Sequence, residues 1–262
     1  MEKILLSDAM LGAIMGAVLG GVVTGFFSWL LQRNTEIRSK TEQLRALLIK
    51  LLEYHEEFDS QIAPIADAAE RDEASRKLNV KRQIYLQAAD LLTLELRRHV
   101  SAAEYITLAR DHQWGGGWEE AERCYRKAVP AARSLDSKAW ALRALAQFYF
   151  LATPKQNLAE GRRQFDKACQ LLKHPKDAYA GYLLGLALES WALAEYGNGE
   201  EPAGDRLLEQ AREAYQRWPH DALCQSCLVA LDKKAAQARR QQPPPPPPPG
   251  QLHPPAEPPP AG

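Results

Sequence analysis

Residues 118–128 read WEEAERCYRKA, and two later segments follow the same pattern. These are LAEGRRQFDKA at residues 158–168 and LEQAREAYQRW at residues 208–218. The shared positions form three columns: Ala121, Gly161 and Ala211; Tyr125, Phe165 and Tyr215; Ala128, Ala168 and Trp218. Offsets of four and seven residues place the columns on one helix face, where small residues let a neighbouring helix approach and a ring fills the space between them. The pattern therefore predicts a repeat of packed helices.

This pattern resembles the tetratricopeptide repeat, whose unit is a pair of antiparallel helices. In the first copy the family columns are matched by Tyr105, Leu108, Ala109 and Trp118, with the glycines at 115–117 in the turn. His112 stands where the family prefers an aromatic residue, and the copies are spaced by 40 and 50 residues, which exceeds the usual spacing of about 34. The resemblance covers residues 102–219, and residues 221–240 match the polar-faced capping helix that such arrays need.

The resemblance implies a concave groove, lined by the first helix of each pair, that binds a peptide or another protein. In the first copy the groove-facing positions are Ile106, Arg110, Gln113 and Trp114. These residues do not reproduce the Lys and Asn carboxylate clamp of the chaperone-binding members. A chaperone C-terminus is therefore not the ligand we expect.

Residues 9–31, AMLGAIMGAVLGGVVTGFFSWLL, contain no charged side chain over 23 positions. A helix of this length crosses a hydrocarbon core of roughly 30 Å. The stretch is longer than the apolar part of a signal peptide and lacks its small-residue cleavage site, so we expect an uncleaved transmembrane helix over residues 9–32. Five Lys and Arg residues follow within residues 33–50, against Lys3 alone before the stretch. This bias predicts a cytoplasmic C-terminal part, with the bacterial inner membrane as the expected location.

The predicted anchor carries small residues at four-residue spacing. The positions considered for self-association are Gly12, Gly16, Gly20, Gly21 and Gly25. Small residues at this spacing let two helices approach closely in lipid, which would make the protein a homo-oligomer. The alternative is a monomeric Gly-rich span, since Gly is common in such helices.

The rest of the chain predicts an all-α fold, because Ala and Leu are abundant and runs of β-branched residues are few. After the short N-terminus at 1–8 and the anchor, residues 33–63 form a juxtamembrane helix with Ile37, Leu44, Leu51 and Phe58 seven residues apart. This helix is either a coiled-coil stalk or an amphipathic helix packed on its own domain. Residues 64–101 follow as a linker and helix, and residues 102–240 form the repeat domain of about three helix pairs with its capping helix.

Residues 241–262 hold twelve of the eighteen prolines. They predict a disordered polyproline tail, either a ligand for an aromatic-lined groove or a solvated spacer. We favour the spacer, because no flanking Arg pattern marks a specific motif.

Composition and motifs give no support for catalysis. The formal net charge is zero, which predicts no general affinity for nucleic acid. Cys224 and Cys227 form a single C-x-x-C pair, whereas a structural zinc site usually needs two such pairs. These two residues, like Cys124 and Cys169, are expected to be buried small hydrophobes. We therefore predict a protein that is not an enzyme, with no catalytic residue, no metal site and no cofactor.

The main functional prediction is a membrane-anchored adaptor that recruits a partner protein to the cytoplasmic face of a membrane. The alternative is an oligomerising single-pass membrane effector whose helical domain senses a signal. A third interpretation, a thiol enzyme that uses Cys224 and Cys227, requires reactive thiols and is the least favoured.

Overall fold

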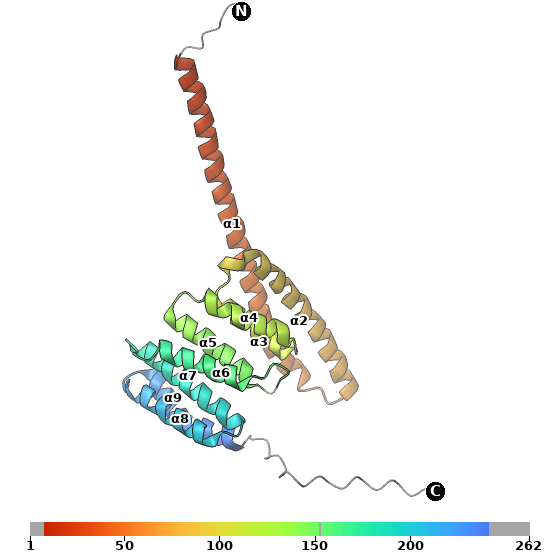
Figure 1. Cartoon of the computed structure of the whole chain (residues 1–262). Coiled ribbons are helices and arrows are strands. Elements are labelled where there is room, and N and C mark those ends of the chain that lie inside the picture. Colours follow the sequence, from red (N-terminus) through yellow and green to blue (C-terminus); the bar gives the residue numbers. More distant parts are fainter. Residues whose placement is uncertain (1–7, 152, 241–262) are drawn as a thin grey trace, which may run out of the picture. The chain divides into compact units, whose positions relative to one another are not determined.

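Helices are the only regular elements in the described residues of the computed structural model, which confirms the predicted all-α class. The structure describes residues 8–151 and 153–240, without the side chains of residues 8–28, 30 and 59. The chain divides into two compact units, Met1–Arg133 and Ser134–Gly262. Figure 1 colours the elements of both units along the chain. Each unit has a buried apolar cluster of its own.

The first unit contains α1 (Asp8–Ile62), α2 (Ala68–Leu96), the short 3-10 helix η1 (Arg97–His99), α3 (Ala102–Trp114) and α4 (Trp118–Ala131). Helix α2 begins where the Asp67 carboxylate accepts a hydrogen bond from the backbone N–H of Glu70. Helix α3 begins with a capping box, in which Ser101 and Glu104 each bond the backbone of the other. Such caps satisfy N–H groups that have no partner within the helix.

The apolar face of α1 packs within its own unit. Leu44 is 0% exposed and Leu51 1% exposed, although both belong to the seven-residue pattern that also predicts a coiled-coil stalk. Tyr54, Ile62 and Leu78 form a buried cluster between α1 and α2. This part of α1 therefore behaves as an amphipathic helix and not as a stalk, because α2 and α3 cover the apolar stripe that a coiled-coil partner would need.

The second unit contains α5 (Leu135–Phe150), α6 (Leu158–Leu171), α7 (Ala178–Gly197), α8 (Glu201–Gln216) and α9 (Ala222–Arg240). Helix α5 packs against α6, α7 against α8, and α5 and α6 both contact α7. Gly161 of α6 permits one of these close approaches, because a β-carbon there would lie 2.6 Å from the ring of Phe150. Helix α9 packs on α7 and α8 through Leu231 and Ala235.

Two of the three repeated columns lie on the buried faces of α4, α6 and α8, whereas in the third column Ala128 and Ala168 are buried and Trp218 is half-buried just beyond the end of α8. Tyr125 is 3% exposed, and Phe165 and Tyr215 are both fully buried. The small residues one turn before these rings, Ala121, Gly161 and Ala211, are buried as well. The face that the spacing predicts is thus the face that packs in each of the three helices.

Among the described residues, no helix offers a stretch of sufficient length and apolar character to cross a bilayer. The backbone of the predicted transmembrane helix, residues 9–32, belongs to α1, but the side chains of residues 9–28 and 30, and with them the positions considered for self-association, lie outside the described part of the chain. The proline-rich tail at 241–262 lies outside that part entirely.

Candidate functional site

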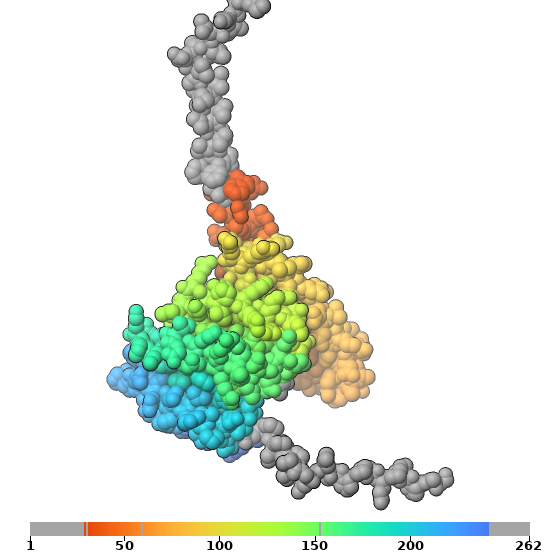
Figure 2. Space-filling model, in the orientation of Figure 1, coloured from red at the N-terminus to blue at the C-terminus, as the bar shows by residue number. Residues whose placement is uncertain are grey.

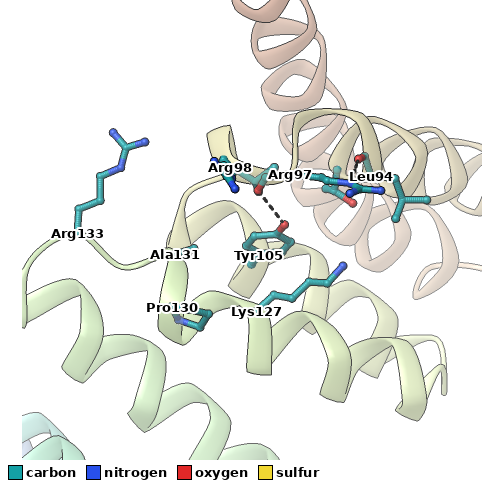
Figure 3. A pocket seen from close by; sticks show the side chains of 10 residues that line it. Leu94, Arg97, Arg98, Tyr105, Lys127, Pro130, Ala131 and Arg133 are labelled. Atoms are coloured by element: carbon teal, nitrogen blue, oxygen red, sulfur yellow. Dashed lines mark hydrogen bonds between the residues drawn. The ribbon is translucent and has the colours of Figure 1, made fainter.

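The first unit contains a cleft of about 650 Å³ between the end of α2, η1, the start of α3 and the end of α4. Figure 3 shows its lining side chains at close range. The cleft is lined by Thr93, Leu94, Arg97, Arg98, Val100, Tyr105, Lys127, Pro130, Ala131 and Arg133. Four of these residues are cationic and none is acidic, so the cleft concentrates positive charge. Apolar side chains, such as Leu94 and Val100, make up part of the same lining.

A sharp change of chain direction after α2 builds one wall of this cleft. Arg97 has φ of 32° and ψ of −77°, and it is the one non-glycine residue with positive φ in the described part of the chain. Its backbone oxygen accepts a hydrogen bond from the Tyr105 hydroxyl at 3.5 Å, drawn in Figure 3. A non-glycine residue held in such a conformation costs about 1–3 kcal/mol, and residues of this kind cluster at functional sites.

The cations of the cleft have no carboxylate within ion-pair distance among the described residues. This holds for Arg97, Arg98, Lys127 and Arg133, although the Lys127 ammonium lies 5.9 Å from the centre of the Tyr105 ring. Unpaired cations around a concave surface attract an anion, since no internal carboxylate competes for their N–H groups.

A second, smaller cleft of about 290 Å³ shares Arg97 and Arg98 with the first. It adds Arg33 from α1 and His99 from η1. Its two acids, Glu36 and Glu95, both pair with Lys40, at 2.5 and 3.0 Å. Space-filling Figure 2 shows the η1 region, in yellow, beside the described start of α1, in orange-red. Arg33 therefore lines one cleft together with Arg97 and Arg98.

The four predicted groove residues have different surroundings in α3. Ile106 is 3% exposed and belongs to the core, whereas Arg110 is exposed. Gln113 is half-buried and accepts a hydrogen bond from the Tyr125 hydroxyl at 3.0 Å. Trp114 is 46% exposed. The three residues from 110 to 114 thus reach the surface, whereas Ile106 does not.

Trp114 also covers a buried ion pair that no sequence pattern predicts. Arg82 and Asp111, exposed by 1% and 2%, pair at 3.0 Å, and His55 lies 3.3 Å from the same carboxylate. The Arg82 guanidinium sits 4.9 Å from the Trp114 ring centre. A β-carbon on Gly115 would lie 2.6 Å from Arg82, so the absence of a side chain at Gly115 leaves room for the guanidinium of this ion pair.

Asp90, His112 and Cys124 are the described residues that could hold a metal ion, with one donor atom from each within 4.8 Å of the others. His112 Nε2 already lies 3.1 Å from the Asp90 carboxylate. Burial raises the pKa of the Cys124 thiol to about 11. Binding of a metal ion at these three residues would require deprotonation of the thiol, because thiols bind metal as thiolates.

The C-x-x-C pair lies on α9, where the Cys224 backbone N–H donates to Asp221 at 2.9 Å. Cys224 is buried, and burial together with Asp221 raises the pKa of its thiol to about 11. Cys227 is half-buried, and both cysteines are free thiols. A protonated, buried Cys224 is a poor nucleophile at neutral pH.

The second unit has a cleft of about 660 Å³ with mixed charge. Arg162 forms two hydrogen bonds to the buried Glu195 carboxylate, at 2.8 and 2.7 Å, and Trp191 Nε1 donates to the same carboxylate at 2.8 Å. Because its central ionic groups satisfy one another, this cleft has less attraction for a ligand than the basic cleft of the first unit.

No known protein family, curated protein or solved structure matches this chain. The chemistry of its sites is therefore the basis for assigning a function to this chain.

Proposed function

We propose that this protein is a membrane-anchored adaptor, whose tetratricopeptide-like helix pairs recruit a partner protein to the cytoplasmic face of a membrane. The observation that carries the proposal is the burial of the aromatic column of the repeat. Tyr125, Phe165 and Tyr215 all lie in the core at the same position of the repeat. Helix pairs that use this column for internal packing leave their other faces available to a partner.

The anchor is supported by the sequence of residues 9–31, which holds 23 positions without a charge. The first side chains of α1 that the structure describes support this part of the proposal. Trp29 is 51% exposed, and the Arg33 guanidinium lies 5.2 Å from its ring centre. Trp and Arg are both enriched where a membrane helix leaves the hydrocarbon.

The partner surface is proposed around Arg110, Gln113 and Trp114, which reach the surface of α3. Arg110 offers a guanidinium, and Trp114 a large, partly exposed ring. Arg and Trp dominate the energetics of protein interfaces. Ile106 supports this surface from the core.

The first test is made on membranes that contain the full chain. An anchored protein stays in the pellet after extraction with alkaline carbonate, and release into the supernatant would reject the anchor. Proximity labelling from the full chain is then compared with the Arg110→Glu variant. We expect a protein that is labelled by the wild type and lost in the variant.

Arg76→Glu is the matched control, because Arg76 is an exposed arginine of α2 outside the proposed partner surface. A labelling pattern that is identical for all three chains would reject the partner surface.

A second candidate function, an oligomerising membrane effector, is favoured by one surface of α2. Val80, Ile84, Leu91 and Leu94 are exposed by 61, 60, 62 and 55%. With Gln87 they follow the alternating spacing of four and three residues that is typical of a coiled-coil seam. Crosslinking of the full chain in membranes separates the two functions. A ladder that is abolished by Gly16→Leu with Gly20→Leu, or by Ile84→Lys, favours the effector, whereas a monomer favours the adaptor.

A further inference from the structure

We propose that the basic cleft of the first unit binds the phosphate of an anionic phospholipid headgroup in the cytoplasmic leaflet. The inference rests on the anchor of the proposed function and goes beyond partner recruitment. On this proposal, the first unit recognises anionic lipids of the membrane in which the protein is anchored.

The basic surface begins close to the end of the apolar stretch. Arg33, which lines the smaller cleft beside Arg97 and Arg98, follows the last residue of that stretch by two positions. At 1.5 Å per residue this is about 3 Å of helix. The polar layer on each side of a bilayer is roughly 5–8 Å thick. When residues 9–31 span the membrane as a helix, this basic surface therefore lies at the level of the lipid phosphates.

The donors of the cleft suit a phosphate group. Arg97, Arg98, Lys127 and Arg133 supply two kinds of donor. Guanidinium groups bind two phosphate oxygens at once, and an ammonium adds a point charge. Glu36 and Glu95 share Lys40, so these three groups together keep one negative charge, which offsets only part of the four positive charges of the cleft.

The apolar part of the lining distinguishes a lipid from a free anion. Leu94, Val100, Pro130 and Ala131 share the cleft with the cations, and Leu94 is 55% exposed. A soluble phosphate has no apolar atoms to bury against this surface, whereas the glycerol and the first acyl carbons of a phospholipid would cover it. Leu91, one turn before Leu94 on α2, is also exposed and adds apolar surface outside the cleft.

The experiment uses the full chain purified in a neutral detergent. Calorimetric titration compares dioctanoyl phosphatidylglycerol, dioctanoyl phosphatidylcholine and inorganic phosphate. We expect saturable binding of the phosphatidylglycerol, at least tenfold tighter than that of inorganic phosphate, and no measurable binding of the phosphatidylcholine. In the Arg98→Glu/Arg133→Glu variant the affinity for phosphatidylglycerol should fall at least tenfold. Arg97 is retained, because its backbone shapes the cleft.

The control variant, Lys173→Glu/Lys233→Glu, makes the same change in net charge at two exposed residues of the second unit. It should bind as the wild type does, and both variants should keep the wild-type circular dichroism. Equal binding of the two lipids would overturn the proposal, and so would equal losses in the two variants. Binding of inorganic phosphate as tight as that of the lipid would assign the cleft to a soluble anion instead.

Failure of this proposal is distinguishable from failure of the adaptor. A chain that resists carbonate extraction but shows no lipid preference keeps its anchor and loses only the headgroup site. A chain that carbonate releases loses the anchor, whatever the titration shows.

Discussion

The ring of Tyr215 lies where a side chain on Gly185 would have to be. A β-carbon at Gly185 would be 2.4 Å from Cε1 of that ring. The Tyr215 hydroxyl then donates to Glu189, at 2.9 Å, and the same carboxylate accepts from Lys234 of α9 at 2.6 Å. One glycine thus allows α7, α8 and α9 to be tied together at a single buried carboxylate.

Gly185→Ala should destabilise the second unit by about 1–3 kcal/mol, because the new methyl group forces the buried ring out of its position. The measurement is urea unfolding of the full chain in neutral detergent. Gly197→Ala is the control, since a β-carbon at Gly197 meets nothing within 4 Å. That substitution should be neutral or slightly stabilising. Equal stability of the two variants would show that α7 and α8 do not pack through this glycine.

Arg162→Met should also destabilise the second unit. It takes the guanidinium away from the Glu195 carboxylate, which is 1% exposed and keeps its hydrogen bond from the Trp191 N–H. Breaking such a pair costs about 3–5 kcal/mol when both groups are buried. The Arg162 side chain is 41% exposed, so we expect a smaller loss, of about 1–3 kcal/mol.

The neighbouring Arg163→Met is the matched control for this pair. Arg163 is 63% exposed and pairs with Glu160 of the same helix, which predicts a loss of about 0–0.5 kcal/mol. Adding Glu195→Gln to Arg162→Met should recover part of the stability, because no buried charge then remains unpaired. Simple additivity of the two substitutions would contradict the pairing.

The thiols should react slowly with iodoacetamide at pH 7.5. Burial raises the pKa of the Cys124, Cys169 and Cys224 thiols to about 11, 12 and 11. Alkylation requires the thiolate, so these groups stay protonated until the pH approaches those values. Mass spectrometry of the native chain should show them unmodified after a time in which the urea-unfolded chain reacts at all four cysteines. Rapid native labelling of Cys224 would instead revive the thiol-enzyme hypothesis.

Glu104 should make stability depend on pH in the acid range. Burial raises the pKa of its carboxyl, but the Ser101 backbone N–H and the Arg45 guanidinium outweigh burial and hold the pKa below its usual value. A lowered folded-state pKa contributes stability above the unfolded pKa of about 4.3, and this contribution is lost as the pH falls through the folded pKa.

Glu104→Gln isolates this charge, because glutamine also fits the capping box. We expect the wild type to exceed the variant by about 0.5–1 kcal/mol at pH 6. The difference should disappear as the pH is lowered below the folded pKa. Unfolding curves measured between pH 6 and pH 2.5 provide the check, and a difference that grows on acidification would have the wrong sign.

Much of the local structure could be predicted from the residues themselves. The column of Tyr125, Phe165 and Tyr215 follows a small residue by four positions in each copy. Such a spacing places both residues on one face of a helix, so the buried face can be predicted from the local sequence. The S-x-x-E sequence at Ser101 predicts a helix start for the same local reason. The cleft could not be predicted in this way, because Arg97 and Arg133 are far apart in sequence and only the packing of α2 on α3, and of α3 on α4, brings them to one surface.

The sequence by itself determined that the chain is helical and which faces of its helices are apolar, because both follow from periodicities within a few turns. Only the tertiary structure decided what covers those faces. The apolar stripe at Leu44 and Leu51 is closed by helices of the same unit. Arg82, in the middle of α2, is buried because Asp111 meets it from α3. A periodicity in the sequence indicates which face of a helix is buried. Which helix covers that face depends on contacts between residues that are distant in the chain.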